Sequence, residues 1–419
     1  MNRRAAILSI TALLAAARAA APRGAFAQGA TTPEVRKATL GYIALTDSAP
    51  LIVAKEKGLF AKYGMPDVEV SKQASWGATR DNLVLGGGSG GIDGAHLLTP
   101  MAYLIHTGRI VQNNQPVPMA LLARLNTNGQ AISVAAKHAS HGAKLDASPL
   151  RRVLTPESKV AMTFRGGTHD LWIRYWLAAA GIDPDRDVST IVVPPPQMVA
   201  NMRVGTMDAF CVGEPWNAQL VAQRLGYTAA ITGEIWKNHP EKAFALRGSF
   251  VEQNPHATQA LLAATIEAAQ WCDVPGNKAE LANILGRRAW FNVPPADILP
   301  RLQGVVDYGD GRNITNLDLT MKFWRDHASY PFQSHDLWFL TEDIRWGVLP
   351  PDTNTRELVA QVNKEALWRA AAERAGVPAS AMPAGTSRGP ETFFDGKVFD
   401  PENPAAYLAS QPIKRSPGA

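Results

Sequence analysis

The chain is poor in cysteine and in long apolar segments. Of its 419 residues only Cys211 and Cys272 are cysteines, which excludes a zinc ribbon or an iron–sulfur site built from cysteine alone. The two thiols could pair in an oxidising compartment or stay buried and free, and their spacing does not decide between these alternatives. No apolar run reaches the roughly 20 residues that cross a bilayer. With 46% hydrophobic and 19% charged residues, the composition predicts globular domains rather than disorder.

Little net positive charge remains once the N-terminus is set aside. The formal net charge is +5, but Arg3, Arg4, Arg18 and Arg23 all lie within residues 1–27, a stretch without acidic residues. The rest of the chain is nearly neutral, whereas a nucleic-acid-binding protein needs a concentrated basic surface. The sequence therefore predicts that nucleic acid is not a partner.

Residues 1–27 have the pattern of a secretory signal peptide. Two arginines precede an apolar stretch over 5–17, and Ala25-Phe26-Ala27 is a small-x-small cleavage motif. The paired arginines also raise the twin-arginine export route. We expect cleavage after Ala27. Because no cysteine lies near that point, we expect a mature protein that is soluble in the periplasm and carries no lipid anchor.

Short apolar strands alternate with helices along the first 250 residues. A helix is predicted over 168–180 and mainly helical structure from 254 onward, and strand patterns cover 37–44, 68–70, 117–125, 131–135, 159–164, 190–193, 209–212 and 243–247. This alternation predicts an α/β fold with open, largely parallel sheets that carry helices on both faces. Ligands of such sheets bind beyond the carboxyl ends of strands, often at helix N-termini. The Pro-, Gly- and Ser-rich residues 379–419 are expected to form an extended surface tail.

Several strand ends carry groups that could contact an anion. The junction Gly166-Gly167-Thr168-His169 exposes backbone N–H groups at a helix N-terminus. Trp76 could donate its indole N–H, Gly213 could let backbone approach a ligand, and Lys242 could neutralise a negative charge. Each also has a purely structural interpretation: a capping histidine, a core tryptophan and a surface lysine are common.

Three further motifs indicate local structure rather than chemistry. The glycine loop 86–91 lacks the Lys-Ser/Thr of a P-loop, so we interpret it as a flexible turn that lets backbone approach a small ligand. His138 and His141 lie in a polar stretch and are expected to be solvated loop residues. The acidic residues over 307–313 do not complete a calcium loop and predict a turn.

Longer phrases resemble the nitrate- and bicarbonate-binding proteins of ABC transporters. They include GYIALTDSAPLIVAKEKGLF, FRGGTHDLWIRYWLAAAGIDP and IWKNHPEKA, and they extend in order from about Ala38 to Pro351. The resemblance implies the two-lobed periplasmic-binding-protein fold of the second topological class, with the ligand in a cleft between lobes that close over it. On this interpretation lobe 1 comprises 28–126 and 250–378, with a helical C-terminal part, and lobe 2 comprises 127–249, with crossovers near 125–127 and 247–250.

The resemblance also implies a ligand site. The positions that match the nitrate branch are Trp76, Gln130, His169, Gly213 and Lys242. The bicarbonate branch has an acidic residue in place of the lysine, so Pro-Glu-Lys favours nitrate or nitrite, with the nearby Lys237 as a surface lysine for comparison. Nitrate is a weak acceptor that needs several fixed donors and a positive charge to offset its lost hydration. Bicarbonate would need an acceptor for its proton as well.

We therefore expect the substrate-binding protein of an ABC importer. It is expected to be a monomer, not an enzyme, that needs no cofactor and passes nitrate or a similar small oxyanion to an inner-membrane ABC permease. A bicarbonate- or organosulfonate-binding protein of the same class is the alternative, and calcium is expected only with bicarbonate. A cytosolic nitrate sensor of the same shape should lack the signal peptide. An enzyme of the thiamin-pyrimidine type should show a histidine cluster, which this sequence lacks.

Overall fold

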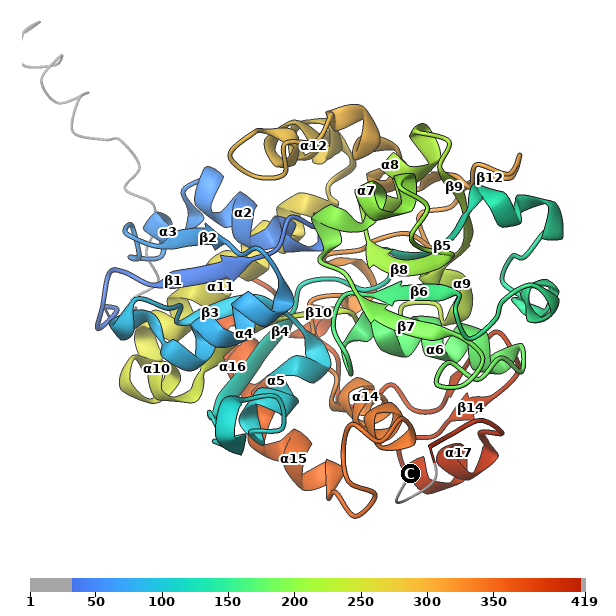
Figure 1. Ribbon diagram of the computed structural model, residues 1–419. Helices are drawn as coiled ribbons and strands as arrows, with labels where there is room; N and C mark the ends of the chain where they lie inside the picture. The colour runs from blue at the N-terminus through green and yellow to red at the C-terminus, as the bar shows by residue number, and fades with distance from the viewer. Residues whose placement is uncertain (1–31, 416–419) are drawn as a thin grey trace, which may run out of the picture. The chain divides into compact units, whose positions relative to one another are not determined.

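Two five-stranded sheets organise the chain (Figure 1). The structure is a computed structural model that describes residues 32–415, so the expected signal peptide over 1–27 lies outside the described residues. Sheet 1, in the order β2-β1-β3-β10-β4, contains β1 Thr39–Tyr42, β2 Glu69–Lys72, β3 Gly94–Leu98, β4 Met119–Arg124 and β10 Lys242–Arg247. Sheet 2, in the order β7-β6-β8-β5-β9, contains β5 Gln130–Ala135, β6 Lys159–Met162, β7 Ser189–Val192, β8 Ala209–Gly213 and β9 Gly226–Ile231.

The two sheets share one topology. In sheet 1, β1 pairs in parallel with β2 and β3, and β10 is antiparallel to both β3 and β4. In sheet 2, β6 pairs in parallel with β7 and β8, and β5 is antiparallel to both β8 and β9. In each sheet the reversed strand is the first one after the chain has crossed from the other sheet. This topology confirms the α/β fold of the second periplasmic-binding-protein class, and we call each sheet with its helices a lobe.

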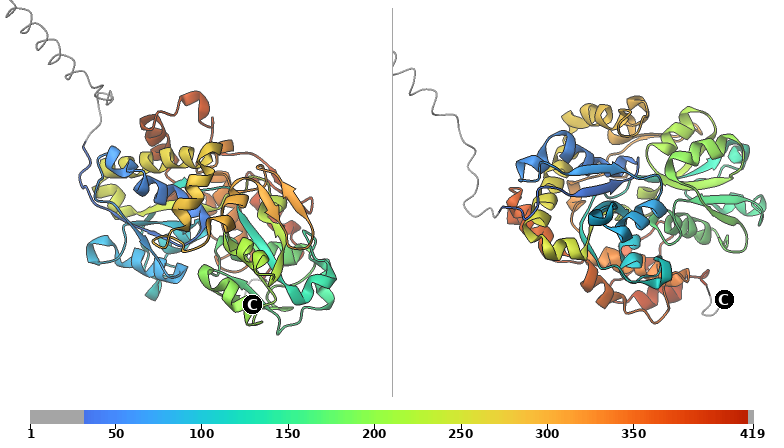
Figure 2. Two further views of the ribbon diagram at one scale, coloured as in Figure 1. Left: turned by 90° about the horizontal axis from the view of Figure 1, so that it is seen from above. Right: turned by 60° about the vertical axis from the view of Figure 1, so that its left-hand side comes forward.

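Helices flank both sheets (Figures 1 and 2), because parallel strands are joined by crossovers that place helices on the sheet faces. Helix α11 packs against α2, α3 and α16, whereas α6 packs against β8 and α8 against β9. No helix within residues 32–415 has the length and apolarity to span a membrane. The helices are α2 Ala49–Glu56, α3 Leu59–Lys62, α4 Trp76–Leu85, α5 Thr99–His106, α6 Thr168–Ala179, α7 Met198–Arg203, α8 Trp216–Ala222, α9 Thr232–Ile235, α10 Gly248–Gln253, α11 Pro255–Asp273, α12 Lys278–Gly286, α13 Leu299–Leu302, α14 Gln333–Arg345, α15 Thr355–Val362, α16 Glu365–Arg374 and α17 Pro404–Ser410.

The strand β10 belongs to lobe 1, which corrects the predicted boundary of lobe 2. The chain enters sheet 2 between Arg124 and Gln130, and it is back in sheet 1 at Lys242. A return near 247–250 and a second lobe reaching 249 are therefore wrong. The physical reason is that β10 is an apolar strand, buried over 242–246, whose backbone pairs with two neighbours in the centre of sheet 1.

Residues 305–319 lie against lobe 2, although they were predicted to belong to lobe 1. The hairpin of β11 Val305–Asp307 and β12 Asn313–Thr315 buries Val306 among side chains of β5 and β9. The chain then returns through Lys322, whose backbone pairs with Thr127. Thr127 also forms a bridge with Pro240. Three chain segments therefore pass side by side between the sheets.

The C-terminal residues up to 415 are not the extended tail that their Pro, Gly and Ser content predicted. They form the strands β13 Glu391–Thr392 and β14 Val398–Phe399 and the helix α17. Phe393 is buried, with its ring centroid 5.0 Å from that of Trp236 and 5.6 Å from that of Trp338. The prediction was wrong because aromatic residues spaced along this segment pack into the core, which bulk composition does not reveal.

Both cysteines are buried free thiols. Cys211 lies in β8 and Cys272 near the end of α11. Burial is the main reason that the pKa of each thiol is raised well above its usual range. Both groups therefore stay protonated and unreactive at neutral pH.

Candidate functional site

The five residues predicted to bind a ligand lie at the ends of strands or at the beginnings of helices, where the two sheets face each other. Trp76 begins α4, Gln130 begins β5, His169 lies in the first turn of α6, Gly213 ends β8 and Lys242 begins β10. The reversed strands explain this placement, because the start of an antiparallel strand lies beside the end of its neighbour. Thus Gln130 pairs with Gly213, and Lys242 pairs with the last residue of β3. The side chains of the four non-glycine residues are buried, and Gly213 is buried as well.

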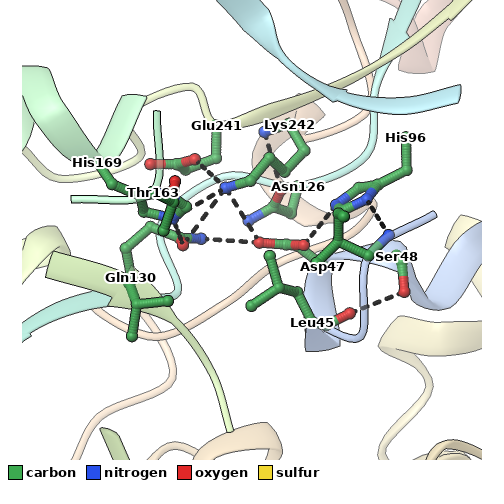
Figure 3. A network of polar contacts seen from close by, with 12 residues as sticks. Leu45, Asp47, Ser48, His96, Asn126, Gln130, Thr163, His169, Glu241 and Lys242 are labelled. Carbon is green, nitrogen blue, oxygen red and sulfur yellow. Dashed lines mark hydrogen bonds and ion pairs between the residues drawn. The ribbon is translucent and has the colours of Figure 1, made fainter. Parts of the chain in front are cut away.

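Lys242 is the centre of a network that joins the lobes (Figure 3). Its Nζ lies 2.6 Å from Glu241 Oε2, 3.2 Å from Asp47 Oδ2 and 3.4 Å from Gln130 Oε1. Gln130 Nε2 in turn donates to Asp47 Oδ2 at 3.0 Å. Lys242 and Asp47 come from lobe 1 and Gln130 from lobe 2, so the network depends on both lobes.

His169 is held as a neutral donor. Its Nε2 lies 2.7 Å from Gln130 Oε1, and its Nδ1 lies 2.6 Å from the hydroxyl of Thr163. An amide oxygen only accepts, so Nε2 carries the proton and Nδ1 accepts from Thr163. Burial, and then the positive charge of Lys242, lower the pKa of His169 well below its usual range.

Asp47 is a site residue that the sequence analysis missed. It follows β1, and its Oδ1 lies 2.6 Å from Nε2 of His96 in β3. The backbone N–H of Ile43 donates to His96 Nδ1 at 3.4 Å, which leaves Nε2–H to donate to Asp47. The helix α2 begins at Ala49 with no capping hydrogen bond from a side chain. An acidic residue directly after a buried strand was the signal that could have identified Asp47.

Trp76 contributes a donor that is not used elsewhere. Its ring centroid lies 5.2 Å from that of His96, beside Asp47. The indole Nε1 is buried, and it has no hydrogen-bond partner among the described residues 32–415. A buried N–H in a native fold usually has a partner, which can be a ligand or an ordered water, so this atom is a candidate donor to a ligand.

Glu241 is a second carboxylate that the sequence analysis did not assign. Its Oε1 accepts from the indole N–H of Trp172, its Oε2 accepts from Lys242, and its backbone oxygen accepts from Thr99 at 2.5 Å. Trp172 stacks on Trp338 with a centroid distance of 4.7 Å. Both carboxylate oxygens of Glu241 thus have partners: Trp172 holds one of them, and the other contacts Lys242.

The charges of the network follow from mutual stabilisation. Burial would raise the pKa of Asp47, but Lys242 and His96 hold it well below its usual range. Burial would lower the pKa of Lys242, but Asp47 and Glu241 raise it above its usual value. Burial raises the pKa of Glu241, and Lys242 only partly opposes this. At neutral pH the site therefore contains a lysine cation and an aspartate anion.

Glycine is needed at position 213 because neighbouring side chains approach its Cα closely, and not because of its backbone angles. A Cβ at this position would lie 2.6 Å from Gln130 Oε1 and 3.1 Å from Asp47 Oδ2. Any side chain would displace these two groups. Next to it, the backbone N–H of Thr46 donates to Glu214 O at 2.7 Å, which is a direct contact between the lobes.

The remaining motifs have structural roles. A Cβ on Gly86 would lie 1.6 Å from Arg247 Nη1, so glycine at this position of the loop accommodates the arginine side chain. His138 is buried with Nε2 2.8 Å from Asp208, which corrects the expectation of a solvated loop histidine. Lys237 is exposed and pairs with an aspartate on the surface. Within residues 32–415, no group of three or more His, Cys, Asp or Glu side chains is arranged to hold a metal ion.

Comparison with known proteins identifies the family. The model of the NMT1-like family matches residues 31–286. The nitrate/nitrite binding protein NrtA of Synechocystis is 58% identical over 92% of this chain and 87% of that protein. The bicarbonate-binding protein CmpA of Synechococcus elongatus is 46% identical over 93% of this chain and 90% of that protein. The nitrate import ATP-binding protein NrtC of Synechocystis is 35% identical over 90% of this chain and 55% of that protein.

A solved structure agrees with this assignment. The crystal structure of the periplasmic nitrate-binding protein NrtA from Synechocystis superposes with a TM-score of 0.90 at 58% identity, and it covers 91% of this chain and 100% of that one. Sequence and structure thus agree over nearly the whole described chain. The chain belongs to the NMT1-like family and, within it, to the nitrate- and bicarbonate-binding proteins of ABC transporters.

Proposed function

We propose that this chain binds nitrate or nitrite between its lobes and passes the anion to the membrane permease of an ABC importer. The observation that carries the proposal is a fully buried lysine, Lys242, at the centre of a network of buried polar side chains from both lobes. The names of the relatives, among them a nitrate/nitrite binding protein, support the same ligand.

The donor set suits a planar monoanion. The Gln130 amide, the Nε2–H of His169 and the orphaned indole N–H of Trp76 are neutral donors, and Lys242 is the positive charge. Several fixed donors offset the hydration that nitrate loses on burial. Because Trp76 and Lys242 belong to lobe 1 and Gln130 and His169 to lobe 2, full coordination requires both lobes to close on the anion.

The proposed setting is the periplasm. The signal-peptide pattern of residues 1–27 supports export. The identity to an import ATP-binding protein supports a role beside an ATPase and a permease. A binding protein of this kind releases its ligand unchanged, so we assign no catalytic step to the chain.

Bicarbonate is the second candidate, because the structure contains acceptors that the sequence analysis did not foresee. The carboxylates of Asp47 and Glu241 both contact Lys242 and could accept the proton of bicarbonate. A bicarbonate-binding relative at 46% identity supports this alternative. The lysine nevertheless favours an anion that needs no acceptor.

Calorimetric titration of the mature protein tests the proposal. Nitrate, nitrite, bicarbonate with and without calcium, and taurine are titrated separately, and nitrate or nitrite is expected to bind. Lys242→Met should weaken nitrate binding by about 30- to 4,000-fold, the equivalent of about 2–5 kcal/mol for one partner of a buried charged contact. Lys237→Met is the matched control, because Lys237 is exposed, and should bind as the wild type does.

The outcomes separate the candidates. Binding of bicarbonate alone would replace nitrate with the second candidate. Binding of none of the four ligands by a folded wild type would refute the oxyanion function. Equal loss of affinity in the two lysine variants would show that Lys242 is not the residue that supplies the charge.

A further inference from the structure

The Asp47 carboxylate contacts the same donors that a bound oxyanion would use. Its Oδ2 contacts Lys242 Nζ at 3.2 Å and Gln130 Nε2 at 3.0 Å, while its Oδ1 contacts His96 at 2.6 Å. A carboxylate is planar and spreads its charge over its oxygens, as nitrate does. Hydrogen bonds from charged and neutral N–H groups therefore suit both anions.

Lys242 has its donors matched within the protein. An ammonium group carries three N–H bonds, and Glu241, Asp47 and the amide oxygen of Gln130 can accept them. Nζ also lies 3.3 Å from His169 Nε2, whose proton is directed to Gln130. Two buried carboxylates face one lysine. An incoming anion therefore meets donors that are already engaged and a network without surplus positive charge.

We propose that Asp47 is an internal anion that competes with the transported oxyanion for Lys242 and Gln130, and that this competition sets the affinity of the site. The inference rests on the proposed function. When the oxyanion binds, Asp47 gives up its contacts with Lys242 and Gln130 and keeps its contact with His96. Asp47 thus acts as a specificity-determining residue, because only an anion that outcompetes a carboxylate is retained.

The competition links anion binding to protons. The groups that face Asp47 are Lys242 at the start of β10, Glu241 just before that strand, His96 from β3, Gln130 from β5 and His169 from α6. Lys242 lowers the pKa of Asp47. Replacing that contact with a ligand anion raises the pKa of Asp47, so the complex binds protons more readily than the free protein. Nitrate affinity should therefore rise as the pH falls.

Calorimetry of nitrate binding to Asp47→Asn tests the inference. Asparagine has the shape of aspartate without its charge. If its oxygen stays toward His96, its amide nitrogen faces Lys242 and Gln130 and can accept from neither, so both donors are left for the anion. Nitrate affinity should rise by about tenfold or more, because close charge pairs are coupled by at least this factor. The matched control is Asp81→Asn, which makes the same charge change at an exposed aspartate and should alter affinity by less than about twofold.

A second measurement covers the case in which Asp47→Asn does not fold. Titrations of the wild type at pH 5 to 7, in two buffers of different ionisation enthalpy, should show proton uptake with nitrate. A folded Asp47→Asn with unchanged or weaker nitrate binding would overturn the inference, as would pH-independent binding without proton uptake by the wild type. A wild type that binds neither nitrate nor nitrite would instead overturn the proposed function itself.

Discussion

Replacing Lys242 with methionine should destabilise the fold as well as the site. Lys242 and its two carboxylate partners, Asp47 and Glu241, are all fully buried. Methionine fills similar apolar space but leaves both carboxylates without their cation. Across the 3.2 Å between Lys242 and Asp47, Coulomb attraction at an effective dielectric of 20 is about 5 kcal/mol before desolvation is counted. Removing one partner of a buried pair costs about 3–5 kcal/mol net.

The deficit should depend on pH in a defined direction. In the wild type the pKa of Asp47 is depressed, so its stabilisation is present above the unfolded pKa of about 4 and is lost as the pH falls through the folded value. Without Lys242, burial raises the folded pKa of Asp47 above its unfolded value, and the pKa of Glu241, which is already raised in the wild type, rises further. Such groups stabilise at low pH and lose that contribution as the pH rises. The difference between wild type and variant should therefore shrink on acidification from pH 7 to pH 5.

Urea unfolding followed by tryptophan fluorescence measures this difference at both pH values. Lys237→Met is the matched control, because Lys237 is exposed in a surface ion pair, and should change stability by less than about 1 kcal/mol. A Lys242→Met protein as stable as the wild type at pH 7 would refute the account of a buried cation. A deficit that stays constant or grows at pH 5 would refute the assignment of that deficit to unpaired carboxylates.

Three other substitutions test further parts of the structure. Gly213→Ala places a Cβ 2.6 Å from Gln130 Oε1 and should weaken nitrate binding by about tenfold or more in calorimetry, a loss that an unchanged affinity would contradict. Trp76→Phe removes an indole N–H that has no partner in the described chain. Nitrate affinity should therefore fall by about fivefold or more, which corresponds to about 1 kcal/mol. Loss of this N–H alone should leave the melting temperature of the free protein unchanged. Phe393→Ala should cost about 3–5 kcal/mol in urea unfolding, because the ring is buried against tryptophans, and a loss below about 1 kcal/mol would show that the C-terminal segment is peripheral.

The sequence by itself predicted the elements whose signals are local. The strands β4 and β5 are buried along their whole length, so they appear as largely apolar runs that can be identified without knowledge of their neighbours. The start of α6 was visible in its Gly-Gly-Thr-His junction. The five site residues came from family resemblance, and the structure brings all five together; that they bind an anion stays a prediction.

Tertiary structure decided what depends on residues far apart in the chain. The interpretation based on the family resemblance assigned β10 to lobe 2, and the strand sequence could not correct this because it does not reveal which sheet supplies the hydrogen-bonding partners. Pairing with β3 and β4 places it in lobe 1 and carries Lys242 there. Sequence alone indicates no partner for Asp47, because His96 and Lys242 are brought beside it only by the packing of β3 and β10. The arrangement of two carboxylates around one buried lysine arises only in the folded chain. The pKa values of these groups depend on burial and on charges contributed by distant segments.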